Sequence, residues 1–442
     1  MTSLPRTGAV RRLGLVGFLT AETISRVGTR MSMVALPWFV LVLTGSPART
    51  GAVAFAEMGP YVLACAFGGP LLDRLGVRRA SIAADVASAA IVVAIPLLYR
   101  DASLGFATLL ALVALAGALR GLGDTAKQAV FPQTVAPSGV DLTRAASVHD
   151  GLSRLAGLLG APLAGLLIAV FDAPTVLLID AATFAAGAVL LGLLVPAPTA
   201  DRADADPADG DAAKREPYLR ALRAGWRFLR GDRLLLAISL MLVATNLFDQ
   251  AFSGVLAPVW ARDVAGSAVA LGLLSGAFSV GAVLGNVIFT AFAPQAPRWA
   301  VFSIGFLVAG APKWVVLALV PELWVVYAVS FLGGLGAAAL NPILGAVLYE
   351  RVPEPLHARV FGMSLAMSWA GIPLGGLAGG FLVQWIGLTP ALLVFAALYF
   401  AATLLPFVDR AWRSLDDRPA APDERGPVVR DDAGTRAAGS AV

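Results

Sequence analysis

The 442-residue sequence is poor in charge and nearly free of the residues that build metal sites and disulfides. Charged residues make up 14% of the chain, against about 25% in a soluble domain. The single cysteine, Cys65, excludes a disulfide within one chain and a cysteine metal site. Histidine occurs at only two positions, His149 and His357, both near expected loops. We therefore expect no metal site and no cofactor.

Lysine is also rare, and its positions exclude an ATP-driven pump. A phosphate-binding loop needs a lysine followed by Ser or Thr. Lys127, Lys214 and Lys313 are instead followed by Gln, Arg and Trp. An HExxH metalloprotease pattern is absent as well. A different membrane-embedded enzyme, a receptor and a lipid scramblase remain as alternatives.

What the sequence has in abundance is apolar residues, at 58% of the chain. A membrane-spanning helix needs ~20 mostly apolar residues, and runs of that length are separated here by Gly, Pro and charges. The first run lacks a cleavage site and is expected to be retained. We predict an all-α membrane protein with twelve transmembrane helices. The predicted spans are 14–43, 50–72, 80–99, 104–131, 144–170, 174–195, 234–260, 268–293, 299–319, 324–350, 358–386 and 389–409.

The distribution of cations predicts the orientation. If the N-terminus is cytoplasmic, only Arg49, Arg100 and Arg262 of the 33 Lys and Arg fall in external loops. Cytoplasmic loops of membrane proteins carry the excess of Lys and Arg. Both termini are therefore expected in the cytoplasm. Heavy use of alanine and arginine suggests a bacterium, and hence its inner membrane.

Four segments follow from these patterns: an N-terminal six-helix bundle (1–195), a cytoplasmic linker (196–233), a C-terminal six-helix bundle (234–410) and a disordered cytoplasmic tail (411–442). The first part of the linker, 196–213, is rich in Asp, Pro and Ala and is expected to be disordered. Its second part should be a basic amphipathic helix on the membrane surface, with a regulatory surface as the alternative. The apolar face of that predicted helix consists of Leu219, Leu222, Trp226 and Leu229. The adjacent basic face consists of Arg220, Arg223, Arg227 and Arg230.

An internal duplication relates the two bundles. The segment Gly160-Ala-Pro-Leu-Ala-Gly165 matches Gly371-Ile-Pro-Leu-Gly-Gly376, and Gly121-Leu-Gly123 matches Gly334-Leu-Gly336. Each pair falls in corresponding spans of a six-plus-six arrangement. We therefore expect two pseudo-symmetric halves, an arrangement suited to alternating access.

The segment after the second span, Gly68-Gly-Pro-Leu-Leu-Asp-Arg-Leu-Gly-Val-Arg-Arg79, resembles the loop motif of the major facilitator superfamily. Its two glycines allow tight turns and close approach, and its aspartate can cap a helix or meet an arginine of another helix. The alternative is that its arginines only set the topology. The expected gating-loop residues are Gly69, Asp73, Arg74, Gly76, Arg78 and Arg79.

The fifth predicted span contains Gly160, Pro162 and Gly165, which resemble the glycine-proline motif of antiporter branches, although Ala161 separates the glycine from the proline. Such residues permit close helix contact and a kink. Residues 44–47, 120–132 and 179–184 resemble the macrolide-efflux and siderophore-export branch of drug–proton antiporters. This resemblance implies proton-coupled export of a hydrophobic, drug-like or natural-product molecule. An uptake permease of the same fold is the alternative.

Ionisable residues inside spans are costly and are default functional candidates. A purely structural salt-bridge network is the alternative. The candidate coupling and substrate-cavity residues are Glu22, Arg26, Arg30, Asp85, Arg120, Asp124, Lys127, Asp249 and Lys313. Glu57, Arg154 and Asp180 also lie within the N-terminal spans.

Because histidine is not expected at depth, the proton carrier should be a carboxylate. Asp124 lies between Arg120 and Lys127 on one helix face and should stay ionised. Glu22 has Arg26 on one side only, and Asp249 has no cation one turn away, so these two are preferred. Lys313 is expected to pair with Asp249 or to line the cavity. The expected partners are a small-molecule substrate, protons and the lipid bilayer, with no nucleic acid, and the protein should be a monomer.

Overall fold

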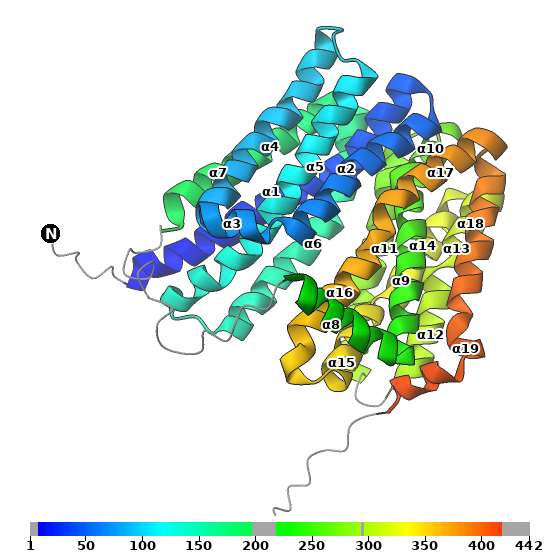
Figure 1. Cartoon of the computed structure of the whole chain (residues 1–442). Helices are drawn as coiled ribbons and strands as arrows, with labels where there is room; N and C mark the ends of the chain where they lie inside the picture. The colour runs from blue at the N-terminus through cyan, green and yellow to red at the C-terminus, as the bar shows by residue number, and fades with distance from the viewer. Residues whose placement is uncertain (1–7, 197–217, 293–295, 418–442) are drawn as a thin grey trace, which may run out of the picture.

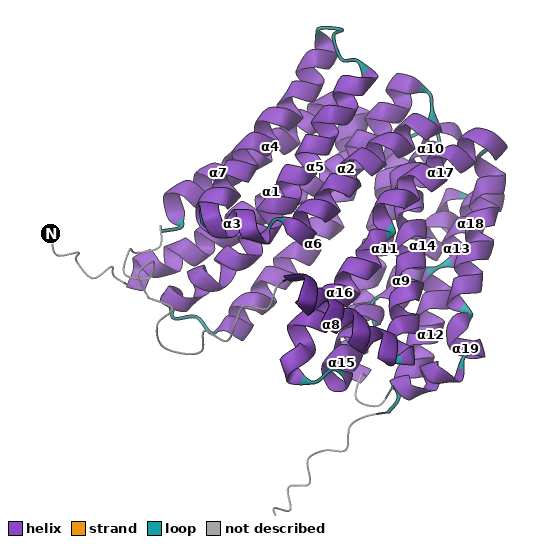
Figure 2. Cartoon of the chain, viewed as in Figure 1, coloured by secondary structure: helices purple, strands orange, loops and turns teal. Residues whose placement is uncertain are grey.

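The computed structural model describes residues 8–196, 218–292 and 296–417. Within these ranges the chain is helical throughout its regular structure and contains no strand (Figure 2). Twelve helical stretches are long and apolar enough to cross a membrane, which confirms the predicted number. Most of the expected disordered linker and tail lies outside the described residues.

Six spanning helices form the N-terminal half (Figure 1). Polar caps and prolines mark where they begin: Ser46 accepts a hydrogen bond from the Arg49 backbone, and Asp172 accepts one from Thr175, which satisfies free amides of the first turn. The helices are α1 (Gly8–Thr44), α2 (Pro47–Phe67), α4 (Val77–Arg100), α5 (Phe106–Val135), α6 (Leu142–Val170) and α7 (Ala173–Leu194), with short α3 (Gly69–Leu75) after α2.

The spans of the C-terminal half are mostly interrupted. Each break is followed within four residues by a proline, which has no backbone N–H and cannot donate a hydrogen bond. The elements are α9 (Arg233–Ala251), the π-helical η3 (Phe252–Leu256), α10 (Ala257–Asp263), α11 (Ala268–Phe292), α12 (Arg298–Ala309), α13 (Ala311–Leu319), α14 (Leu323–Ala337), α15 (Leu340–Arg351), α16 (His357–Ala370), α17 (Ile372–Ile386), α18 (Leu388–Thr403) and α19 (Leu405–Val408).

The duplicated glycine motifs make duplicated contacts. Gly160 of α6 packs against α1 at Arg30, and its counterpart Gly371 packs against the backbone of α9 at Val243. Further along, Gly165 packs against α11 and its counterpart Gly376 packs against α2. Helices α1 and α9, like α2 and α11, occupy equivalent places in the two halves. The pseudo-symmetry expected from the sequence is therefore present in the packing.

We call the side where α1 begins the terminal face, and the side with the turns at Gly45, Ser103 and Gly266 the opposite face (Figure 1). The two halves meet closely toward the opposite face, where glycines let backbones touch. On α2 and α17, Gly51 lies against Gly376 and Gly380. On α6 and α11, Gly165 lies against Gly272.

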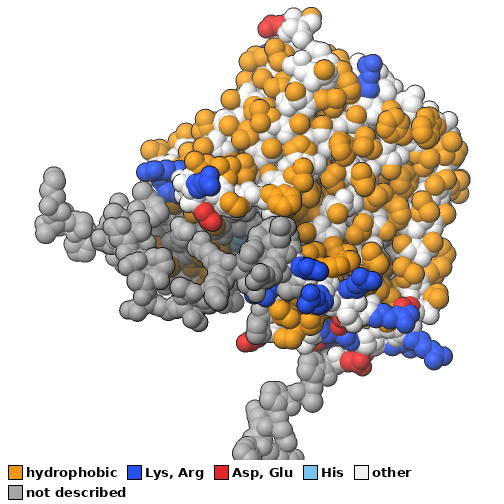
Figure 3. All heavy atoms as spheres, viewed as in Figure 1, with side chains coloured by type: hydrophobic (Ala, Val, Ile, Leu, Met, Phe, Trp, Pro, Cys, Tyr) orange, Lys and Arg blue, Asp and Glu red, His pale blue; other side chains and the backbone are white. Residues whose placement is uncertain are grey.

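Figure 3 shows hydrophobic side chains over the middle of the molecule and most of the visible Lys and Arg toward the terminal face. Helix α8 (Tyr218–Gly231) lies at that face, and its Gly225 packs against the α16 backbone at Arg359. Leu229 is buried, whereas Trp226, Arg227 and Arg230 are exposed. The predicted helix is therefore present, and it is docked on the C-terminal half.

The first residues of the segment expected to be a disordered tail, which starts at residue 411, are instead part of a folded element. Residues Arg410–Leu415 form a 3-10 helix, η5, in which Trp412 and Leu415 are buried. The Trp412 ring lies 5.7 Å from that of Phe302 on α12. Burial of the large Trp412 side chain explains why this segment is folded although its sequence is largely polar.

Candidate functional site

A cavity of about 570 Å³ lies between the two halves. Small-molecule sites typically measure about 300–1,000 Å³. The N-terminal half lines the cavity with residues of α1, α2 and α6. The C-terminal half lines it with residues of most of its helices. The charged and polar side chains that line it include Arg30, Glu57, Asn246, Asp249, Gln250, Lys313, Asn341 and Tyr399.

In the C-terminal half, Lys313 and Asp249 form an ion pair in the cavity wall. Lys313 Nζ lies 2.7 Å from Asp249 Oδ1, and the Tyr399 hydroxyl donates to Asp249 Oδ2 at 3.4 Å. The structure thus brings Lys313 to Asp249, as expected, and both line the cavity. Asp249 lies just before the π-helical segment η3, and π-helical turns are frequent at functional sites.

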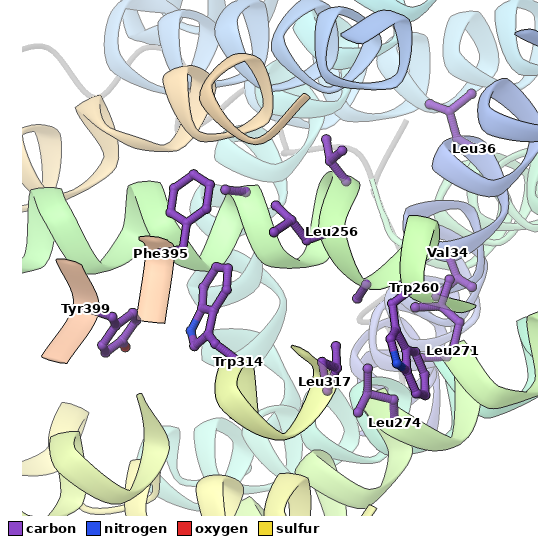
Figure 4. Packing of buried hydrophobic residues seen from close by; sticks show 14 of the residues in the cluster. Val34, Leu36, Leu256, Trp260, Leu271, Leu274, Trp314, Leu317, Phe395 and Tyr399 are labelled. Atoms are coloured by element: carbon purple, nitrogen blue, oxygen red, sulfur yellow. The ribbon is translucent and has the colours of Figure 1, made fainter. Parts of the chain in front are cut away.

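Aromatic rings surround the Lys313 ammonium. Its Nζ lies 4.9 Å from the ring centroid of Phe252 and 5.6 Å from that of Tyr399, within the range of cation–π attraction. Figure 4 shows Trp314 close to Phe395 and Tyr399, from α13 and α18. The pair therefore has one exposed partner, Asp249, and one partner enclosed by rings.

Arg30 of α1 is an exposed guanidinium in the cavity wall. Among the described residues, no carboxylate lies within 4.0 Å of it, and it donates a hydrogen bond to the Met33 sulfur at 3.8 Å. Its Cβ packs against Gly160. Arg30 therefore presents an unpaired positive charge to the cavity.

The charges of α5 pair with other helices and not with one another. Arg120 binds Glu57 of α2 at 2.6 Å, and Lys127 binds Asp85 of α4 at 2.8 Å. Asp124 accepts a hydrogen bond of 3.0 Å from the Tyr61 hydroxyl. The expectation that Asp124 is held between Arg120 and Lys127 is therefore wrong, because neighbouring helices engage both cations.

Glu22 lies near one end of its membrane span and differs from expectation in its partners. It lies 22 residues from the end of α1 at Thr44, or about 33 Å of helix, which is roughly the full hydrocarbon thickness. It is therefore near the terminal face rather than mid-membrane. It binds Arg26 at 2.5 Å and His149 Nε2 at 2.9 Å. The expectation that Arg26 is its single partner is thus wrong, because His149, which lies near the terminal face like Glu22, is a second one.

Of the nine candidate coupling and cavity residues, three line the cavity: Arg30, Asp249 and Lys313. Glu22, Arg26, Asp85, Arg120, Asp124 and Lys127 lie elsewhere in the N-terminal half. Glu57 lines the cavity and was missed as a candidate, although its position inside a span is the signal that could have identified it. Within the described ranges, no three His, Cys, Asp or Glu residues are grouped as metal ligands would be.

The expected gating loop is mostly helical. Gly69 to Leu75 form α3, Gly76 turns with a φ of +77°, and Arg78 and Arg79 lie in the first turn of α4. Close approach to a neighbour occurs at Gly68 and not at Gly69, where a Cβ would meet nothing within 4 Å.

The charged side chains of this segment have different surroundings. Arg78 donates to the carbonyl oxygens of Val195 and Gly192 at 2.8 and 2.7 Å, and so caps the end of α7. Asp73 is exposed, and no described cation lies within 4.0 Å of it. Arg74 is also exposed. In this state the segment holds α7 through Arg78 but forms no latch through Asp73.

The expected helix-packing residues all lie at interfaces. Gly160 faces α1 within the N-terminal half. Pro162 and Gly165 face Gly272 and Gly276 of α11, across the boundary between halves. The motif therefore joins helices within one half and also joins the two halves.

Similar proteins share this architecture. The nucleoside transporter NupG superposes with a TM-score of 0.73 at 15% identity, covering 89% of this chain and 98% of that one. A bacterial homologue of the lysosomal transporter Spinster, described as inward-facing, gives a TM-score of 0.66 at 16% identity, covering 95% and 100%. At these identities the likeness concerns the fold alone.

Curated relatives are more similar in sequence. The multidrug efflux pump Tap of Mycobacterium tuberculosis (strain ATCC 25618 / H37Rv) is 28% identical over 410 residues, which cover 92% of this chain and 96% of Tap. The staphyloferrin A transporter of Staphylococcus aureus (strain NCTC 8325 / PS 47) is 25% identical over 166 residues, covering 37% and 41%.

The family profile of the Major Facilitator Superfamily matches residues 18–250 and 240–429, which together span most of the chain. Proteins of this family are transporters rather than enzymes, so a membrane-embedded enzyme is excluded. With its twelve spanning helices and duplicated halves, this chain is a multi-pass membrane protein that belongs to the Major Facilitator Superfamily.

Proposed function

We propose that this protein is a secondary active transporter that exports a hydrophobic, drug-like or natural-product molecule from a bacterial cell in exchange for protons. The observation that carries this proposal is the cavity between two pseudo-symmetric halves, with glycine contacts joining the halves toward the opposite face. A cavity at the boundary of two such halves is the site around which alternating access operates.

The composition of the cavity wall favours an amphipathic cargo. Its apolar residues come from both halves and include Met33, Val34, Phe252, Phe278 and Leu340. Polar groups are fewer, as in sites that fix the orientation of mostly apolar ligands. The similarity to the multidrug efflux pump Tap supports export over uptake.

Energy coupling by protons completes the proposal. The sequence has no phosphate-binding loop, so export needs an ion gradient. The cation distribution supports cytoplasmic termini, so the terminal face would be the inner side of the bacterial inner membrane. The state described here would then be closed toward the outside. We infer that Asp73 acts as a latch only in the other state, which explains its lack of a partner here.

The test is transport by the purified full-length protein in proteoliposomes, with ciprofloxacin and a macrolide as probes. A proton antiporter accumulates its substrate when the vesicle interior is acidic, and a proton symporter does so when the exterior is acidic. We expect accumulation with an acidic interior that a protonophore abolishes, measured against protein-free liposomes. Accumulation driven only by an acidic exterior would establish an uptake permease instead.

A further inference from the structure

Asp180 of α7 is a buried carboxylate that the sequence did not place among the candidate site residues. It is 2% exposed. Ser32 of α1 donates a hydrogen bond to Oδ2. The Thr183 hydroxyl, which donates to the Asp180 backbone carbonyl at 2.7 Å, lies 3.3 Å from Oδ1. No described cation lies within 4.0 Å. A buried carboxylate without a cation favours the neutral, proton-bound form.

The other buried carboxylates of this half are held differently. Glu22, Glu57 and Asp85 each pair with a cation, which stabilises their ionised form. Asp124 lacks a paired cation but is only partly buried, and the Tyr61 hydroxyl donates to it. Asp180 therefore combines full burial with the absence of a cationic partner.

A second, smaller cavity of about 40 Å³ lies beside Asp180. It is lined by Ser32, Ser88, Asp180, and the ion pair of Glu57 and Arg120. This volume is enough for about one water molecule. Glu57 lines both this cavity and the large one between the halves. Glu57 is thus a residue that the substrate cavity and the cavity beside Asp180 share.

The groups that surround Asp180 come from four helices. Helix α1 contributes Ser32 and the backbone at Gly28, whose missing side chain leaves room for the carboxylate. Helix α4 contributes Ser88, α2 contributes Glu57 and α5 contributes Arg120. Farther along α4 and α5, Asp85 and Lys127 neutralise each other. Arg120 is the nearest cation in this set, and Glu57 already pairs with it.

We propose that Asp180 binds the transported proton and that Glu57 passes it between the substrate cavity and Asp180. The proton comes from water in the substrate cavity, transfers to Glu57 and then, through water in the small cavity, to Asp180. It returns to water by the reverse steps when the cavity faces the other side. On helix α1, Ser32 donates a hydrogen bond to Asp180 and Arg30 lines the substrate cavity. Protonation of Asp180 therefore changes a contact of a helix that also lines the substrate site.

The first experiment uses protons as the only probe and does not require transport. Infrared difference spectra of the purified full-length protein, taken between acidic and alkaline buffer, report the carbonyl stretch of protonated carboxyl groups. We expect a buried-carboxyl band in the wild type and in Asp150→Asn, an exposed control, and its loss in Asp180→Asn. An unchanged band in Asp180→Asn overturns the assignment.

Two further variants keep the test decisive if Asp180→Asn fails to fold. Ser32→Ala removes a donor to Asp180 and should change the frequency of the band without removing it. Glu57→Gln should slow the response of the band to a pH jump at least tenfold. If neither Ser32→Ala nor Glu57→Gln affects the band, the proton is bound at another residue and the assignment to Asp180 fails.

The second experiment measures coupling, and this part rests on the proposed proton-driven export. In proteoliposomes with ciprofloxacin, Asp180→Asn should keep exchange in the absence of a gradient but lose accumulation driven by an acidic interior. Asp150→Asn should retain both. If the wild type accumulates no probe, the proposed function fails while the infrared assignment stands. If Asp180→Asn accumulates like the wild type, the coupling role of Asp180 fails alone.

Discussion

At the scale of single residues, the enclosed Lys313 ammonium depends on Asp249 for charge compensation. Its side chain is 10% exposed, whereas that of Asp249 is 44% exposed. A cation in such surroundings is costly once its counter-charge is removed. The aromatic rings around it compensate only in part.

We therefore expect Asp249→Asn to lower the free energy of unfolding by about 1–2 kcal/mol. This is less than the roughly 3–5 kcal/mol for a fully buried pair, because Asp249 is in contact with the cavity. Thermal unfolding in detergent measures the loss, and Asp150→Asn is the matched control. The double variant Asp249→Asn, Lys313→Gln should recover stability but not transport. Full stability of the single variant would show that the pair contributes little.

The sequence predicted which residues place charge inside the membrane, and it predicted the Glu22–Arg26 and Asp249–Lys313 pairs, but it did not predict the partners of the α5 charges. The spacing of Arg120, Asp124 and Lys127 pointed to contacts along α5. The observed partners, Glu57, Tyr61 and Asp85, come from other helices. Such pairings depend on how each helix is rotated about its axis, and helix rotation is not contained in the spacing along one helix.

At the scale of helices, the same residue type has different effects in the two halves. Prolines lie within the N-terminal helices, for example Pro37, Pro96 and Pro162, yet α1, α4 and α6 remain continuous. In the C-terminal half, Pro312 and Pro373 follow breaks at Gly310 and Gly371. The number of spans was predictable from apolar runs. The breaks were not, because neighbouring helices decide whether a proline interrupts a helix.

Substitution at the contact between α2 and α17 can test whether its glycines allow the two halves to close at the opposite face. A Cβ at Gly51 would overlap the Gly376 carbonyl, whereas one at Gly59 on the same helix meets nothing within 4 Å. We expect Gly51→Ala to reduce transport at least several-fold, because the halves cannot close there, and Gly59→Ala to leave it unchanged. The readout is accumulation in proteoliposomes. Equal activity of the two variants would refute this role for the contact.

The segment from α3 to α4 allows a separate test of gating. Asp73 is exposed and unpaired with any described cation in this state. Asp73→Asn should therefore leave unfolding temperature and membrane expression close to wild type, while transport falls because the latch in the other state is weakened. Near-wild-type turnover would leave only a topological role for this segment. Loss of stability would show instead that Asp73 supports the state described here.

At the scale of the whole molecule, the sequence predicted two related halves because the duplicated motifs occupy matching spans. It could not predict the cavity, because its wall combines side chains from helices as far apart as α1 and α18. Arg30, Asp249 and Lys313 were candidates because each is a charge within a span. Asn246 and Tyr399 gave no such signal, since uncharged polar residues are common in membrane helices.

The orientation of the molecule can be measured directly. If the termini are cytoplasmic, a cysteine at Asp206, in the linker, should resist membrane-impermeant thiol reagents in intact cells when Cys65 is replaced by Ser. A cysteine at Ser103, in the exposed turn of the opposite face, should react quickly under the same conditions. Disruption of the cells should expose the first site. Rapid labelling of Asp206→Cys in intact cells would reverse the assigned orientation.

The unpaired Arg30 also bears on which molecules the protein can accept. The two acidic residues of the cavity wall, Glu57 and Asp249, are each matched by a cation, which leaves Arg30 as the uncompensated charge of this set. A guanidinium stays protonated at any physiological pH, and its field extends farther in a low-dielectric wall than in water. We therefore expect the cavity to act as an electrostatic filter that disfavours permanent cations, such as ethidium, and favours neutral, zwitterionic or acidic compounds, so that charge as well as size would limit its cargo.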